Sequence, residues 1–185
     1  MKKYIISLLT LAVLAASCSR PEDGTYTFRV LTTNDVHGHY FDSLYVSDGT
    51  ANSLMNVSWY ADSIRVADGA ENVILLDAGD CLQGDNAAYY YNYVDTLSKH
   101  VYARMVEYIG YNAVVVGNHD IETGHPVYDR MVKSMKVPFL AANAIRTDNG
   151  KPYFQEYVTL KRHGLNVTII GFTNPNIKGW LSPGL

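Results

Sequence analysis

The sequence is poor in cysteine and in charged residues. Two cysteines in 185 residues are too few for a small domain held together by disulfides. Lysine and arginine number 15 against 18 aspartates and glutamates, and this lack of a basic excess excludes a general binder of nucleic-acid polymers. Charged residues make up 18% of the chain and hydrophobic residues 48%, which is enough for a buried core. The composition therefore predicts one globular domain rather than a disordered chain.

The N-terminus is typical of a bacterial secretory signal. Two lysines precede an uncharged, mainly apolar run over residues 4–16, which is shorter than the roughly 20 apolar residues of a membrane span. The small residues at 15–17 lead into Cys18, and this ending resembles a lipobox, in which the cysteine is lipidated and becomes the first mature residue. We expect a signal peptide of the lipoprotein type at 1–17, a lipid on Cys18 and a tether at 18–25.

This interpretation places the protein in the cell envelope, anchored by its lipid to a bacterial membrane and facing the periplasm or the exterior. The alternative is an ordinary signal peptide cleaved near Ser17, which would give a soluble periplasmic or secreted protein. In either case we expect no other contact with a membrane. The sequence does not predict an oligomeric state.

Strand-like and helix-like segments alternate through the rest of the chain. Short apolar runs predict strands at 26–33, 72–77, 113–116 and 137–142, and apolar residues three or four apart predict helices at 51–67, 99–109 and 126–135. Residues 157–161 and 165–172 flank a turn at 162–164 and predict a hairpin. This order predicts an α/β fold with mixed, mostly parallel sheets flanked by helices.

Polar groups follow successive predicted strands at the point where each strand ends. These groups are Asp35 and His37, Asp80, Asn118 and His119, and Asn143. Any one of them alone is typical of a loop, but ligands bind at the carboxyl ends of the strands in open α/β sheets, and the groups occur in order. Side chains alternate along an extended chain, so we expect Asp35 and His37 to point the same way and to bind one ion. Carboxylate, imidazole and amide donors favour a transition metal over calcium.

Three motifs resemble a known family. DVHG at 35–38, GDCLQG at 79–84 and GNHD at 117–120 resemble the first three blocks of the calcineurin-like metallophosphoesterases, and their neighbours resemble the secreted 5'-nucleotidase and 2',3'-cyclic phosphodiesterase branch. The resemblance extends from about residue 26 to the C-terminus. It implies a four-layer α/β/β/α catalytic domain, of which residues 26–185 would be the N-terminal part.

The resemblance also implies a centre with two divalent metal ions. It assigns metal binding to Asp35 and His37 at the first ion, to Asp80 as the bridge between the ions, and to Asn118 at the second ion. His119 matches the catalytic histidine of the family. Glu122 stands where the nucleotidases have an aspartate that orients this histidine. Mn, Zn, Fe, Mg and Ca are not distinguished by these residues, although the donor types favour a transition metal.

The implied activity is hydrolysis of small phosphoesters, above all nucleotides, by water that two metal ions activate. The family completes its metal site with a later GHxH block, which does not occur among these 185 residues. We therefore expect the chain to be the N-terminal part of a longer enzyme and to be weakly active by itself. The alternative is a non-catalytic envelope lipoprotein that binds a metal ion or phosphate.

Overall fold

The computed structural model describes residues 23–43 and 52–179, so the predicted signal peptide and Cys18 lie outside the described residues. Its main sheet is parallel, with the strand order β1-β2-β3-β4. The strands are β1 (Arg29–Thr33), β2 (Val73–Asp77), β3 (Ala113–Val115) and β4 (Phe139–Leu140). The longer helices that connect them are α2 (Leu54–Asp68), α4 (Val101–Ile109) and α6 (His125–Ser134). This arrangement confirms the predicted α/β class.

The structure adds short helices that the sequence pattern does not predict. They are η1 (Ala70–Asn72), α3 (Asn86–Tyr89), the π-helical η2 (Tyr90–Val94), α5 (Asn118–Glu122) and the 3₁₀ segment η3 (Pro175–Gly179). Each has five residues or fewer, too few for a helical repeat of apolar positions to show. Among the helices described, none is both long and apolar enough to span a membrane.

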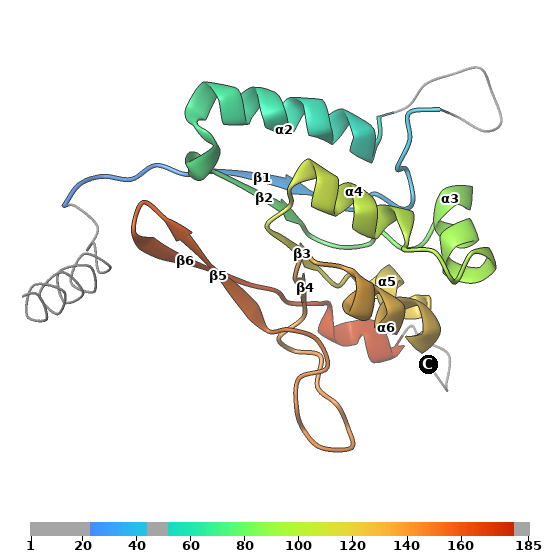
Figure 1. Cartoon of the computed structure of the whole chain (residues 1–185). Coiled ribbons are helices and arrows are strands. Elements are labelled where there is room, and N and C mark those ends of the chain that lie inside the picture. The colour runs from blue at the N-terminus through green and yellow to red at the C-terminus, as the bar shows by residue number, and fades with distance from the viewer. Residues whose placement is uncertain (1–22, 44–51, 180–185) are drawn as a thin grey trace, which may run out of the picture.

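The core lies between the parallel sheet and its helices. Ala61 of α2, Val106 of α4 and Met131 of α6 are fully buried, as are Leu75 and Val114 of the sheet. Figure 1 shows α2 and α4 together over one face of the sheet. Burial of these apolar side chains against the strands fixes the helix layer relative to the strand ends.

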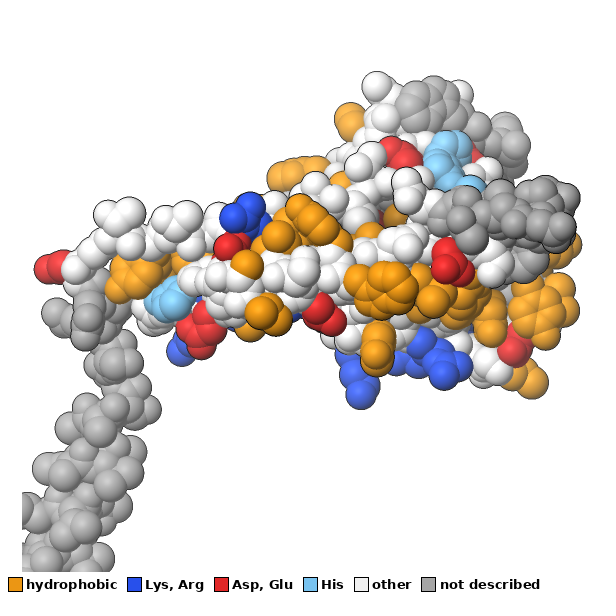
Figure 2. Space-filling view, turned by 90° about the horizontal axis from the view of Figure 1, so that it is seen from above, with side chains coloured by type: hydrophobic (Ala, Val, Ile, Leu, Met, Phe, Trp, Pro, Cys, Tyr) orange, Lys and Arg blue, Asp and Glu red, His pale blue; other side chains and the backbone are white. Residues whose placement is uncertain are grey.

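Helix α2 is apolar on its outer side as well. Met55, Trp59 and Val66 lie on one side of the helix because they are spaced by four and seven residues. They are exposed, with Trp59 at 75% and Val66 at 88%. Figure 2, which looks down on the molecule from the α2 side of Figure 1, shows hydrophobic side chains across this surface. The helical pattern in the sequence therefore combines a buried stripe and an exposed one.

A β-hairpin forms a second, two-stranded sheet. Strands β5 (Tyr157–Arg162) and β6 (Leu165–Ile170) are antiparallel, and the residues between them, His163 and Gly164, have φ angles of 50° and 78°, as a tight two-residue hairpin turn requires. The base of the hairpin is joined to the chain after β4 by the bond from Ala142 N to Gly171 O, 2.8 Å. In Figure 1 the hairpin runs along the side of the sheet opposite α2.

The register of the parallel strands brings their carboxyl ends together. Thr33 of β1 lies beside Asp77 of β2, and Val114 of β3 also pairs with Asp77. The segments that follow these three strands therefore leave the sheet at one edge. This edge carries the polar motifs.

Asp77, the last residue of β2, is a buried carboxylate at this edge. It accepts hydrogen bonds from the Thr33 hydroxyl at 2.5 Å, the Gly79 N–H at 2.8 Å and the Cys81 thiol at 3.1 Å. Burial raises the pKa of Asp77 from 3.8 to about 6, although the hydrogen bonds act in the opposite direction. A carboxyl whose pKa is raised by folding stabilises the fold at low pH, and this contribution is lost as the pH rises through 6.

We predict that Asp77→Asn makes the protein less sensitive to this pH change. The amide keeps the shape and an acceptor for Gly79, and the Thr33 hydroxyl can turn to accept from the new NH₂ group. The free energy of unfolding of the variant minus that of the unchanged protein should be about 1 to 2 kcal/mol higher at pH 7.5 than at pH 5. This difference is measured by urea unfolding, followed by circular dichroism, in buffer that contains a metal chelator. Asp62→Asn on the exposed side of α2 controls for the loss of a carboxylate, and parallel pH curves for the Asp77 variant and the unchanged protein would contradict the prediction.

Candidate metal centre

Two of the three loops at the carboxyl edge are joined through their backbones. The loop after β1 donates from Asp35 N to Gly79 O at 3.1 Å and from His37 N to Asp80 O at 2.9 Å. Both acceptors belong to the loop after β2. These bonds hold the DVHG motif against the GDCLQG motif, although the two are far apart in sequence.

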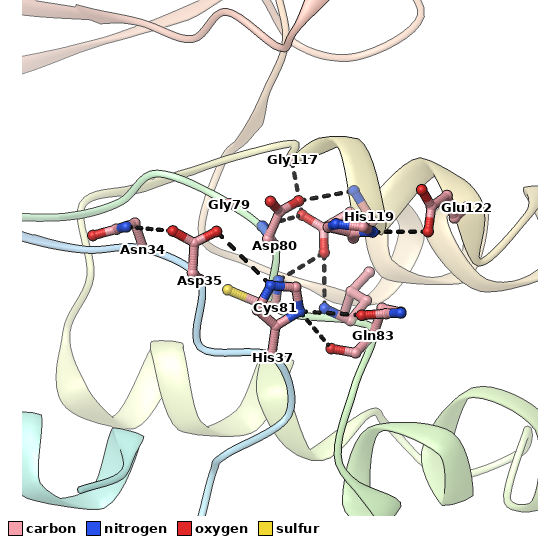
Figure 3. Close-up of polar contacts among 12 residues, drawn as sticks. Asn34, Asp35, His37, Gly79, Asp80, Cys81, Gln83, Gly117, His119 and Glu122 are labelled. Atoms are coloured by element: carbon pink, nitrogen blue, oxygen red, sulfur yellow. Dashed lines mark hydrogen bonds and ion pairs between the residues drawn. The ribbon is translucent and has the colours of Figure 1, made fainter. Parts of the chain in front are cut away.

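Three predicted site residues come together where the loops meet. A nitrogen of His37, an oxygen of Asp80 and a nitrogen of His119 all lie within 4.8 Å of one another, and the three residues are half-buried. The rings of His37 and His119 are in edge contact, with centroids 5.2 Å apart. Figure 3 shows their side chains converging from the loops after β1, β2 and β3. The imidazole of His37 and the carboxylate of Asp80 are donors that suit Mn, Fe or Zn, so the residues present fit a divalent metal ion.

The other predicted residues border this cluster. The carboxylate of Asp35 lies 3.8 Å from Nε2 of His37. Asn118 is the first residue of α5, half-buried and directly before His119. Glu122 lies one turn further along α5, and its Oε2 is 2.8 Å from Nδ1 of His119. This hydrogen bond raises the pKa of His119, and partial burial opposes the rise.

The expectation that Asp35 and His37 lie on an extended segment is wrong. Strand β1 ends at Thr33, and the φ angles of Asp35 and His37 are 52° and 46°, in the left-handed region. The chain turns sharply because its N–H groups bind the carbonyls of the neighbouring loop rather than continuing the strand. The two side chains nevertheless lie close together, through the turn and not through strand alternation.

His37 is held in one tautomer by Gln83. Its Nδ1 lies 3.1 Å from the backbone carbonyl oxygen of Gln83 and 3.1 Å from the side-chain Oε1. Both partners are acceptors, so Nδ1 carries a proton and Nε2 is the nitrogen left for a metal ion. Nε2 is the atom 3.8 Å from the Asp35 carboxylate. A hydrogen bond of this kind orients the histidine ligands of metal sites.

The two glycines that precede Asp80 and Asn118 are needed for close approach. A Cβ on Gly117 would lie 2.1 Å from Oδ1 of Asp80, and a Cβ on Gly79 would lie 2.6 Å from the backbone nitrogen of Gly117. The same Oδ1 of Asp80 accepts a 2.8 Å hydrogen bond from the His119 N–H. The loop after β2 therefore packs directly on the start of α5, and its aspartate is fixed against the histidine.

Two further polar residues at the centre, Gln83 and Asp120, have no role predicted from the sequence. Gln83 contacts His37 partly through its backbone carbonyl, which any residue carries. Asp120 is buried, and the hydrogen bonds of its carboxylate within the described part of the chain come from backbone N–H groups. In the sequence, only their positions inside the GDCLQG and GNHD motifs point to a place at the centre.

Known proteins match the chain in sequence over most of its length. Protein UshA of Salmonella pullorum is 32% identical over 180 residues, which cover 92% of this chain and 31% of that protein. The 5'-nucleotidase of Vibrio parahaemolyticus is 29% identical, with 92% and 30% covered. The 2',3'-cyclic-nucleotide 2'-phosphodiesterase/3'-nucleotidase of Yersinia enterocolitica is 25% identical, with 97% and 29% covered. The chain thus spans about a third of the length of these relatives. No protein-family profile matches it.

Solved structures match the fold. The calcineurin-like phosphoesterase YfkN of Bacillus subtilis superposes with a TM-score of 0.68 at 24% identity, covering 82% of this chain and 49% of that one. The 5'-nucleotidase precursor of Thermus thermophilus gives a TM-score of 0.62 at 28% identity, covering 83% and 30%. The motifs, the matched sequences and the shared fold agree. The chain is therefore similar over most of its length to UshA and to 5'-nucleotidases, and it has the fold of the calcineurin-like phosphoesterases.

Proposed function

We propose that this chain supplies the N-terminal half of a centre for metal-dependent hydrolysis of phosphoesters, with nucleotides as the substrate class. The convergence of His37, Asp80 and His119 at the carboxyl edge of the sheet carries the proposal. The relatives support the substrate class, since their names describe 5'-nucleotidases and a cyclic-nucleotide phosphodiesterase. The alternative is a lipoprotein that binds a metal ion or phosphate without hydrolysis.

The proposed metal ligands are Asp35, His37, Asp80 and Asn118. Two bound divalent ions would supply Lewis acidity, lowering the pKa of water and neutralising charge on the phosphoryl group. His37 would bind through Nε2, because its Nδ1 is turned to Gln83. The carboxylate of Asp80, fixed by the His119 N–H, would be shared by both ions.

His119 is the proposed catalytic residue and Glu122 its positioning partner. Nδ1 of His119 is bound to Glu122, which leaves Nε2 as the nitrogen that can act on a substrate. The rise in the pKa of His119 favours the protonated form. Nε2–H can then donate to a phosphoryl oxygen as negative charge develops, or give its proton to the leaving oxygen.

Backbone strain at the proposed ligands supports a functional site. Among the described residues, the non-glycine positions with positive φ are Asp35, His37, Asp80 and His163. His163 lies in the hairpin turn, and the other three are proposed ligands. Strained residues of this kind persist where the surroundings hold them in place, and they cluster at functional sites.

The location in the cell envelope and the lipid on Cys18 are also part of the proposal. They rest on the N-terminal sequence pattern. Mass spectrometry of the protein from the membrane fraction should find Cys18 as the first residue, carrying lipid. A soluble product that starts at another residue would overturn the anchor and leave the proposed chemistry unaffected.

We predict that the protein isolated from its native envelope binds Mn²⁺ and hydrolyses a nitrophenyl phosphate ester, 5'-AMP or 2',3'-cyclic AMP. Asp80→Asn should remove most metal and most turnover, because one carboxylate serves both ions. His119→Asn should keep the metal and lower kcat by about 10²- to 10⁴-fold, as expected for loss of a general acid. Elemental analysis and steady-state rates measure the two effects. Full metal content with no hydrolysis of any of the three esters would favour the binding lipoprotein.

We also predict that removing strain at position 35 stabilises the fold. Asp35→Gly and Asp35→Ala both delete the carboxylate and should weaken Mn²⁺ binding alike. In a chelator, the glycine variant should be more stable than the alanine variant by about 1 kcal/mol, because glycine adopts a left-handed φ without a steric cost. Urea unfolding of the matched pair isolates the strain, and equal stabilities would show that position 35 is unstrained.

A further inference from the structure

We propose that Asp120 is a positioning residue that fixes the Asp80 carboxylate relative to His119 and thereby sets metal affinity. This inference rests on the proposed metal role of Asp80. Asp120 is the third residue of α5 and is 1% exposed, so its carboxylate points into the protein and not toward substrate. It acts through the backbone of its neighbours.

The Asp120 carboxylate accepts four hydrogen bonds from two loops. Oδ1 accepts from the N–H groups of Cys81 and Leu82, each at 2.8 Å. Oδ2 accepts from the N–H groups of Asp80 at 3.0 Å and Gly117 at 2.8 Å. An ionised carboxylate has about four acceptor positions, so this one is fully used. It joins the loop after β2 to the residue that precedes α5.

The three successive N–H groups of Asp80, Cys81 and Leu82 converge on one anion. Successive backbone N–H groups that include a left-handed residue can form such a concave arrangement of donors, and Asp80 has a φ of 61°. The Asp120 carboxylate fills this concavity. It therefore stabilises the backbone conformation that points the Asp80 side chain into the cluster.

Asp120 and Asp80 each bind the backbone of the segment that carries the other. Asp120 on α5 binds the backbone of Asp80, and Asp80 binds the backbone N–H of His119 on α5 at 2.8 Å. The result is a closed ring of hydrogen bonds around the contact of the two loops. A shift of either loop breaks both halves of the ring, so the positions of Asp80 and His119 are coupled.

Asparagine cannot replace Asp120 in this arrangement. Its amide has one oxygen, so two of the four N–H groups would face an NH₂ group whichever way the amide turned. The loop after β2 would have to move to satisfy them, and Asp80 would move with it. Substitution of groups that orient metal ligands typically lowers metal affinity 10- to 100-fold.

The test is Mn²⁺ affinity, measured by electron paramagnetic resonance of free Mn²⁺ in titrations of the native protein. Asp120→Asn should raise the dissociation constant 10- to 100-fold. Asp120→Ser, which keeps one small acceptor, serves as the second variant in case the first does not fold. Val106→Ala in the core of α4 is the control, because it should lower thermal stability and leave Mn²⁺ affinity unchanged.

The outcomes separate this inference from the proposed function. If the unchanged protein binds Mn²⁺ and a folded Asp120 variant binds it equally well, the positioning role is overturned and the proposed function stands. If the unchanged protein binds no Mn²⁺, the proposed function fails and the inference with it. If neither variant folds in saturating Mn²⁺, Asp120 is a folding residue and the assignment to metal positioning is wrong.

Discussion

The hydrogen bonds between the Asp120 carboxylate and four backbone N–H groups are the contact on which the geometry of the candidate centre depends. The parallel register of β1, β2 and β3 brings three loops to one edge, but it does not specify how the loops fold. Asp120 joins two of them in a water-poor interior, where a missing acceptor would leave several donors unsatisfied. The loop after β1 is then held by the backbone of the loop after β2.

The main elements were predictable because the chain marks them with repeating apolar patterns. Strands β2 and β3 lie within the predicted ranges 72–77 and 113–116, and helix α6 begins one residue before the predicted start. Strand β1 is shorter than predicted: Tyr26 and Phe28 have the composition of a strand, but the pairing with β2 begins at Arg29. Helix α5 begins inside the polar GNHD motif, where no apolar repeat exists.

The convergence of the candidate site residues could be predicted from the sequence, but their local backbone conformation could not. Polar residues after successive parallel strands must meet, and His37, Asp80 and His119 do. The left-handed turns at Asp35 and His37 could not be inferred, because most residues avoid that region and only the surrounding hydrogen bonds select it. The Asp120 carboxylate is bound by backbone N–H groups, and Gln83 contacts His37 partly through its backbone carbonyl; the backbone carries no information about residue type.

The contact between the hairpin and η1 has a consequence for the order of folding. His163 binds Asn72 across a separation of 91 residues, whereas His119 binds Asp80 across 39. Closing the longer loop costs more chain entropy, and contacts of high sequence separation form late. The three loops of the centre belong to consecutive strand-helix-strand units, so they can assemble while the hairpin is still undocked. A growing chain could therefore complete these loops before its second sheet is in place.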